Sequence, residues 1–209
     1  MSYEAIPRRA VLAGAGALAA ASSIAVAAQA QGANDVAKVL IATDHGDILA
    51  GLEVAKAPIT CGNFLRYVDA GRYDGSSIYS AVQAPGAPDV GLIEGGIDDP
   101  RKLYPPIAHE STEVTGLKHL DGTLSMARDG LGTAASDFFV CVGAASYLDA
   151  NPAGTGDNTG YAAFGQVLQG MEVVRAILAL PATGVARNPS MQGQILDPPV
   201  RIISMKRAG

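Results

Sequence analysis

Gly122-Thr123-Leu124-Ser125-Met126-Ala127-Arg128 is the first of three short stretches that decide the fold of this chain. The other two are Ser136-Asp137-Phe138-Phe139-Val140 and Gly160-Tyr161-Ala162-Ala163-Phe164-Gly165-Gln166-Val167. Each contains a short run of apolar and aromatic residues next to turn-forming residues, the pattern of a strand. We therefore predict strands at residues 124–127, 138–143 and 164–168.

The remaining chain adds further short strands and two helices. Two apolar runs, residues 36–43 and 48–54, flank an Asp/Gly turn and predict an antiparallel hairpin. Helical spacing of apolar residues predicts helices at 58–71 and 171–178, and the second should bury Val173, Val174 and Ile177. Pro and Gly mark loops at 84–88, 95–106 and 151–159, and Pro198-Pro199 introduces a last strand at 200–205. This mainly β pattern is typical of a closed antiparallel barrel capped by two α-helices.

The N-terminus has the pattern of an export signal. Pro7-Arg8-Arg9 precedes an apolar run over residues 10–28, and Ala28-Gln29-Ala30 has the spacing of a signal-peptidase site. A membrane anchor is the alternative, but Ala and Gly dominate the run and contribute little transfer energy. We expect a signal peptide at 1–30, similar to twin-arginine signals, a linker at 31–38 and one domain at 39–209. The mature protein would then be periplasmic or secreted, without a stable membrane span.

Charge bears on the partners of this protein, and the histidines and cysteines bear on metal binding and packing. The 209 residues carry a formal charge of −5 and no Lys/Arg cluster, which argues against nucleic acid and anionic lipid as partners. His45, His109 and His119 are scattered, and we expect neither a metal nor a cofactor. Cys61 and Cys141 are expected to be small buried apolar residues.

The order and spacing of these motifs resemble the cyclophilins, a β-barrel family of peptidyl-prolyl cis-trans isomerases. The resemblance covers residues 39–205, nearly the whole expected domain. Besides the three opening stretches it rests on further matches, namely Thr43-x-x-Gly46-x-Ile48, Pro58-x-Thr60-x-x-Asn63-Phe64, Gly71-x-Tyr73-x-Gly75, Glu94-Gly95-Gly96 and Gly165-x-Val167-x-x-Gly170-Met171-x-Val173-Val174. It implies an eight-stranded barrel and a groove that binds proline-containing polypeptides.

The reaction of that family is rotation about the peptide bond before proline. The barrier is roughly 18–20 kcal/mol, because this C–N bond has partial double-bond character. A dry apolar pocket for the proline ring and a hydrogen-bond donor for the twisted amide are sufficient to lower it. In the family an arginine guanidinium is that donor.

Several polar positions depart from the family pattern. The family's Phe-His-Arg run aligns with Ile78-Tyr79-Ser80, so Ser80 stands at the catalytic arginine position. Its short hydroxyl lacks the fork of donors that a guanidinium presents. Glu94 and Asp137 each replace a glutamine, and Gly91 replaces a phenylalanine that forms one wall of the proline pocket.

The apolar positions are better preserved. The resemblance assigns the proline pocket to Leu92, Ala127, Phe139 and Leu148, with Tyr161 as a further catalytic-site residue. Arg128 is placed at the edge of the groove, where it could contact a peptide carbonyl or form an ion pair with Glu94 or Asp137. Glu94 and Asp137 could also be a catalytic carboxylate pair, but altered peptide contacts are the interpretation we favour.

The resemblance thus implies a peptidyl-prolyl isomerase that acts on X-Pro bonds of exported proteins, with activity weakened at Ser80. The alternative is a non-catalytic module of the same fold that binds proline-containing peptides or a partner protein. A third interpretation is a barrel whose groove is vestigial and whose loops, such as 151–159, make a different contact.

Overall fold

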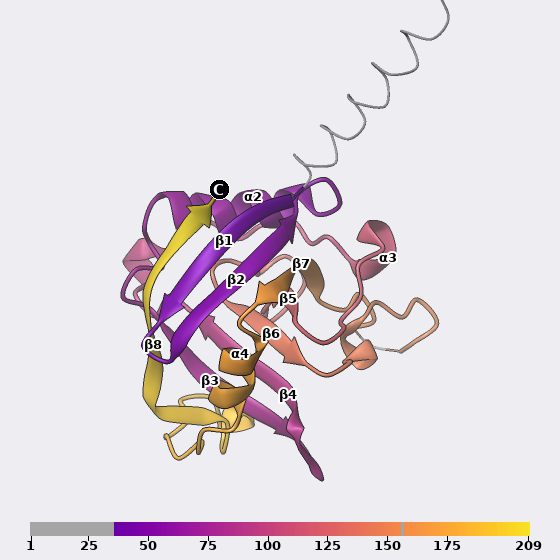
Figure 1. The fold of residues 1–209 in the computed structure, drawn as a ribbon. Helices are drawn as coiled ribbons and strands as arrows, with labels where there is room; N and C mark the ends of the chain where they lie inside the picture. The colour runs from indigo at the N-terminus through magenta and orange to yellow at the C-terminus, as the bar shows by residue number, and fades with distance from the viewer. Residues whose placement is uncertain (1–35, 156) are drawn as a thin grey trace, which may run out of the picture. The chain divides into compact units, whose positions relative to one another are not determined.

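The computed structural model describes residues 36–155 and 157–209. Eight strands form a closed antiparallel barrel in the order β1-β2-β7-β5-β6-β4-β3-β8 (Figure 1). The strands are β1 Val36–Thr43, β2 Gly46–Glu53, β3 Ser77–Ala84, β4 Ala87–Gly96, β5 Thr123–Met126, β6 Phe138–Val142, β7 Ala162–Gln169 and β8 Ile195–Ala208. The predicted barrel is confirmed.

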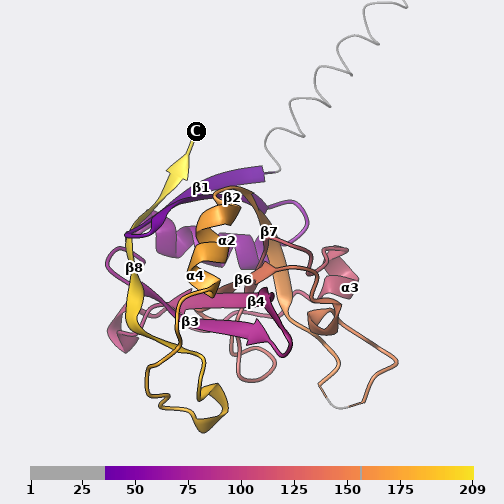
Figure 2. The ribbon, with the colours of Figure 1, turned by 60° about the horizontal axis from the view of Figure 1, so that its bottom comes forward.

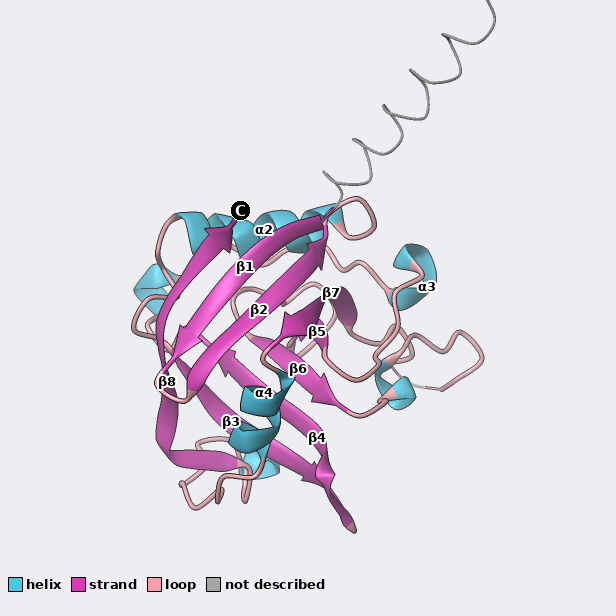
Figure 3. Ribbon diagram, in the orientation of Figure 1, coloured by secondary structure: helices cyan, strands magenta, loops and turns pink. Residues whose placement is uncertain are grey.

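Two helices cover the barrel ends, α2 at Pro58–Asp69 and α4 at Met171–Leu178 (Figures 1 and 2). A third helix, α3 at Thr112–Thr115, lies outside the ring of strands and was not predicted (Figure 3). Short 3-10 turns are present at Pro100–Lys102, Ser146–Leu148 and Pro189–Met191. In the part of the chain that the structure describes, none of the helices is long and apolar enough to cross a membrane.

Several element ends differ from the sequence prediction. The predicted loop at 84–88 is wrong, because β3 runs to Ala84 and β4 begins at Ala87, so only Pro85 and Gly86 form the turn of this hairpin. β1 spans the predicted run 36–43, so its first three residues fall within the segment that was assigned to the linker. β8 starts at Ile195 rather than residue 200 and includes both prolines. This is possible because Pro198 and Pro199 lie between the β8 positions that pair with Ile78 and Ser80. The expected signal peptide and the start of the linker lie outside the described residues.

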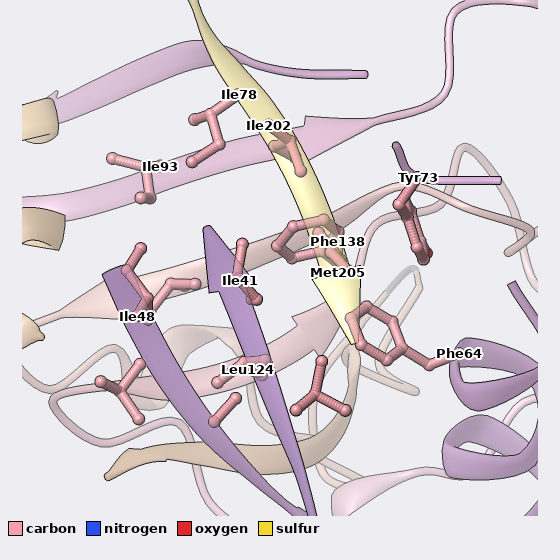
Figure 4. Close-up of a cluster of buried hydrophobic side chains, with 14 of the residues drawn as sticks. Ile41, Ile48, Phe64, Tyr73, Ile78, Ile93, Leu124, Phe138, Ile202 and Met205 are labelled. Carbon is pink, nitrogen blue, oxygen red and sulfur yellow. The ribbon is translucent and has the colours of Figure 1, made fainter. Parts of the chain in front are cut away.

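The barrel interior is filled by aliphatic and aromatic side chains from the strands and α2 (Figure 4). Phe64 of α2 packs against Tyr73, Phe138 and Phe164, with ring centroids 5.1–5.5 Å apart. Such tilted and edge-to-face pairs stabilise a core beyond the area they bury. Helix α4 buries Val174 and Ile177 completely, whereas Val173 is half-buried. Cys61 and Cys141 are buried free thiols, as expected.

Helix α2 is capped by a side chain that lies far away in the sequence. Ala57, the residue before the helix, has only a methyl group and cannot accept a hydrogen bond from the helix N-terminus. The carboxylate of Glu110 does so instead. It accepts from the backbone N–H groups of Ile59 (3.1 Å) and Thr60 (2.7 Å) and from the Thr60 hydroxyl (2.6 Å). The loop before α3 is thereby fastened to the end of the barrel.

Glu110→Ala should destabilise the protein by about 1–3 kcal/mol, because it leaves the buried N–H and hydroxyl of Thr60 without their acceptor. Urea unfolding measures this difference. Glu113→Ala, at an exposed position of α3, is the matched control. Equal unfolding midpoints for the two variants would show that the contact does not stabilise the fold.

Candidate active site

A cavity of about 480 Å³ opens on the outer face of the barrel over β4, β5 and β6. It brings together every site residue predicted from the sequence except Ser80: Leu92, Glu94, Ala127, Arg128, Asp137, Phe139, Leu148 and Tyr161. The loop that holds Asn188, Ser190 and Gln194 closes one side. Whether any of these groups contacts a peptide stays a prediction.

The floor of the cavity is a small apolar cluster separate from the barrel interior. Phe139, Cys141, Ala145 and Leu148 are buried in it, and Leu92, Ala127 and Tyr161 pack against them. The rings of Phe139 and Tyr161 meet edge to face, with centroids 5.5 Å apart. Alternation along β6 produces this arrangement, since Phe138 points into the barrel and Phe139 points to the cavity.

His119 supports the floor from behind. Its ring is stacked on Phe139 with centroids 5.9 Å apart, and it is 1% exposed. One ring nitrogen contacts Asp149 at 2.8 Å and the other contacts the hydroxyl of Ser125 at 2.9 Å. Ser125 is completely buried, so the three residues form a structural bridge rather than an accessible nucleophile. His119 could not be linked to its partners from the sequence, because they lie 6 and 30 residues away.

The opposite wall of the cavity is polar and acidic. The hydroxyl of Tyr79 lies 3.0 Å from Glu94 Oε1 and 3.2 Å from Asp137 Oδ2. Burial raises the pKa of Tyr79, and it is also the main cause that raises the pKa values of Glu94 and Asp137. Gly96 makes this arrangement possible, because a Cβ atom there would overlap Asp137 Oδ1.

Tyr79 contacts two residues of the cavity wall and could not be recognised as their partner from the sequence. The β3–β4 ladder pairs Ile78 with Gly95 and Ser80 with Glu94, which leaves Tyr79 as an extra residue in a β-bulge. A bulge can redirect a side chain, and bulges are frequent next to active sites. The aligned Ile78-Tyr79-Ser80 run gives no sign of the bulge, because pairing depends on the partner strand.

Ser80 occupies the predicted strand position but does not line the cavity. Its pairing with Glu94 places both side chains on the same face of the sheet. Ser80 is nevertheless completely buried, and its hydroxyl has no hydrogen-bond partner among the described residues. A buried, unpaired hydroxyl destabilises a fold by about 1–3 kcal/mol. The geometry therefore gives Ser80 no direct route to a bound peptide.

Arg128 lines the cavity, but its guanidinium is fully engaged. Two parallel hydrogen bonds join it to Asp157, at 2.6 and 3.0 Å, and others reach Thr159 and the carbonyl oxygen of Gly160. The carboxylate that pairs with Arg128 is therefore Asp157, not Glu94 or Asp137. Arg128 also lies over the ring of Tyr161, 5.1 Å from its centroid. Its role in the structure is to hold the loop before β7 against the cavity.

The missing aromatic wall is explained by the backbone at Gly91. Gly91 pairs with Gln83, and a Cβ atom at Gly91 would overlap the carbonyl oxygen of Val82. A phenylalanine at this position would therefore require the two strands to move apart.

His119→Gln should lower the free energy of unfolding by about 1–3 kcal/mol at neutral pH, because Gln cannot keep both hydrogen bonds and the stacking. Burial lowers the pKa of His119, so the folded state favours the neutral ring. Stability should therefore fall as the pH drops below the unfolded-state value of about 6.5. Urea unfolding at several pH values should show this decrease in the free energy of unfolding with falling pH in the wild type, and a smaller slope against pH in His119→Gln. His45→Gln, at an exposed position, should keep the wild-type slope; equal slopes in all three proteins would contradict the role of His119.

Comparisons with known proteins identify the family of the chain. Residues 38–207 match the family described as cyclophilin type peptidyl-prolyl cis-trans isomerase/CLD. The chain is 36% identical over 144 residues to peptidyl-prolyl cis-trans isomerase A of Dickeya dadantii, covering 66% of this chain and 70% of that protein. It is 32% identical over 168 residues to a peptidyl-prolyl cis-trans isomerase of Acinetobacter baylyi, covering 78% and 81%.

Solved structures show the same fold. A cyclophilin-type isomerase of Cryptosporidium parvum superposes with a TM-score of 0.63 at 22% identity, over 83% of this chain and 98% of its own. The same protein crystallised in the presence of the dipeptide Ala-Pro gives the same TM-score. The barrel, the cavity with its apolar floor and the sequence matches lead to one conclusion: the chain belongs to the cyclophilin-type peptidyl-prolyl cis-trans isomerases.

Proposed function

We propose that this protein is an isomerase of weakened activity that acts on X-Pro bonds of exported proteins. The observation that carries the proposal is the contrast between the two walls of the cavity. The apolar floor can hold a proline ring, whereas Arg128, the one Lys or Arg side chain that lines the cavity in the described part of the chain, is bound to Asp157. Substrate binding is thus supported better than stabilisation of the twisted amide.

Export rests on the sequence of the N-terminus. Residues 1–30 combine a basic start, an apolar run and a small-x-small site, the three parts of a secretory signal. Mass spectrometry of the protein recovered from the periplasm or medium tests this proposal. A mature N-terminus near residue 31 supports it, and an intact Met1 in the cytoplasmic fraction contradicts it.

A binding module without turnover is the second candidate. It is favoured by the same contrast, because the floor is intact while a free guanidinium donor is lacking among the described residues that line the cavity. Isomerisation of a set of X-Pro peptides separates the two functions. Without catalyst the reaction takes tens to hundreds of seconds at 25 °C, so modest catalysis is measurable. A rate equal to background, together with peptide binding, would favour the module.

Ser80→Arg should raise kcat/KM by about tenfold or more, which corresponds to about 1.4 kcal/mol of transition-state stabilisation. The reason is that Ser80 faces the same side of the sheet as Glu94, so a longer side chain would have to emerge toward the cavity. Because Ser80 is completely buried, Tyr79→His combined with Ser80→Arg provides a second variant with more room. Ser204→Arg on β8 is the control for added charge. No gain in either folded variant would mean that Gly91 and Glu94 have remodelled the groove.

A further inference from the structure

Two carboxylates contact one phenol at the polar wall of the cavity. Tyr79 has a single hydroxyl hydrogen, yet its oxygen lies within hydrogen-bond distance of both Glu94 and Asp137. One hydrogen cannot satisfy two negatively charged oxygens. Two like charges in one poorly solvated site also disfavour each other's ionised form, as in carboxyl pairs that share a proton. The arrangement therefore favours one neutral carboxyl group.

Hydrogen bonding identifies Glu94 as the carboxyl that keeps the proton. Asp137 Oδ1 accepts from the hydroxyl of Ser136 at 2.9 Å, and this bond stabilises the ionised form of Asp137. Glu94 has one side-chain partner among the described residues, Tyr79, and that contact involves Oε1. In the neutral acid the proton therefore lies on Oε2, which has no partner among the described residues, while Oε1 accepts from the Tyr79 hydroxyl; Oε2 is then the donor available to a group in the cavity that Glu94 lines.

The charges around Glu94 also favour its neutral form. Burial raises the pKa of Glu94, and the negative charges of Asp137 and Asp129 raise it further, while the hydrogen bond from Tyr79 opposes the shift. Arg128, the nearby cation, is paired with Asp157 on the loop before β7. The lining loop contributes the neutral side chains of Asn188, Ser190 and Gln194.

We propose that Glu94, as a neutral carboxylic acid, donates a hydrogen bond to the peptide held on the apolar floor. This inference rests on the proposed function and names a donor in place of the family's arginine. Glu94 pairs with Phe139 across the β4–β6 ladder, so its carboxyl group and the aromatic floor share one face. The proton stays on Glu94 throughout. The bond strengthens as the amide twists, because the prolyl nitrogen then becomes a hydrogen-bond acceptor.

The pH dependence of kcat/KM tests the proposal, because this parameter reports ionisation of the free enzyme. Exchange NMR on X-Pro peptides from about pH 4 to about pH 9 brackets a raised carboxyl pKa and needs no helper protease. The donor is present below the pKa of Glu94 and lost above it, so activity should fall about tenfold per pH unit above that pKa. Glu94→Gln keeps an N–H donor at every pH and should give a flat profile. Glu113→Gln, exposed on α3, should keep the wild-type profile.

Two variants of residues next to Glu94 should move the midpoint of the pH profile of kcat/KM in opposite directions. Tyr79→Phe removes the bond that stabilises ionised Glu94, so the midpoint moves to higher pH. Asp137→Asn removes a negative charge, so the midpoint moves to lower pH. A general folding defect would lower activity at all pH values without moving the midpoint.

The outcomes separate this inference from the proposed function. Catalysis with a flat wild-type profile, or with the same pH dependence in Glu94→Gln, overturns the Glu94 donor and leaves the isomerase intact. Absence of catalysis at every pH overturns the isomerase. The affinity of a Pro-peptide, measured by NMR titration, then decides the inference: affinity lost above the Glu94 pKa in the wild type but not in Glu94→Gln supports the donor. Affinity independent of pH, or no binding, overturns it.

Discussion

The alternation of side chains along β6 is the constraint on which the rest of the molecule depends. Phe138, Val140 and Val142 fill the barrel, while Phe139 and Cys141 build the floor of the cavity. A shift of one residue in strand register would exchange the two sets, because the side-chain period of a strand is two. Core packing and cavity geometry are therefore fixed by the same ladder hydrogen bonds.

The same ladders place residues of the cavity and residues buried beside it in one row. Ser80 pairs with Glu94, Glu94 with Phe139, and Phe139 with Ser125, so these four residues from β3, β4, β6 and β5 lie side by side. Ser125 in turn holds His119 against Phe139. Sites carried by strands are held more rigidly than sites on loops. The bulge at Tyr79 interrupts the β3–β4 ladder beside this row, and it brings a phenol to the two carboxylates.

Most of the fold and much of the cavity could be predicted from the sequence, since local patterns and ordered motifs carry them. The hairpin of β1 and β2, the bounds of α4 and the apolar floor are examples. Three features could not be predicted, because each depends on residues brought together by folding. These are the bulge at Tyr79 that brings its hydroxyl to Glu94 and Asp137, the bridge from His119 to Asp149, and the pairing of Arg128 with Asp157. Burial of Ser80 belongs with them, because a strand position does not reveal what covers it.

The close approach of β3 and β4 at Gly91 makes substitutions in this hairpin depend on one another. The carbonyl oxygen of Val82 occupies the space that any β-carbon at position 91 would need. A single codon change at this position therefore cannot restore an aromatic wall, because the backbone of the hairpin would have to shift first. Mutations that open the hairpin must precede or accompany such a change. A deeper proline pocket at this groove therefore requires coupled substitutions, at position 91 and in the hairpin that surrounds it.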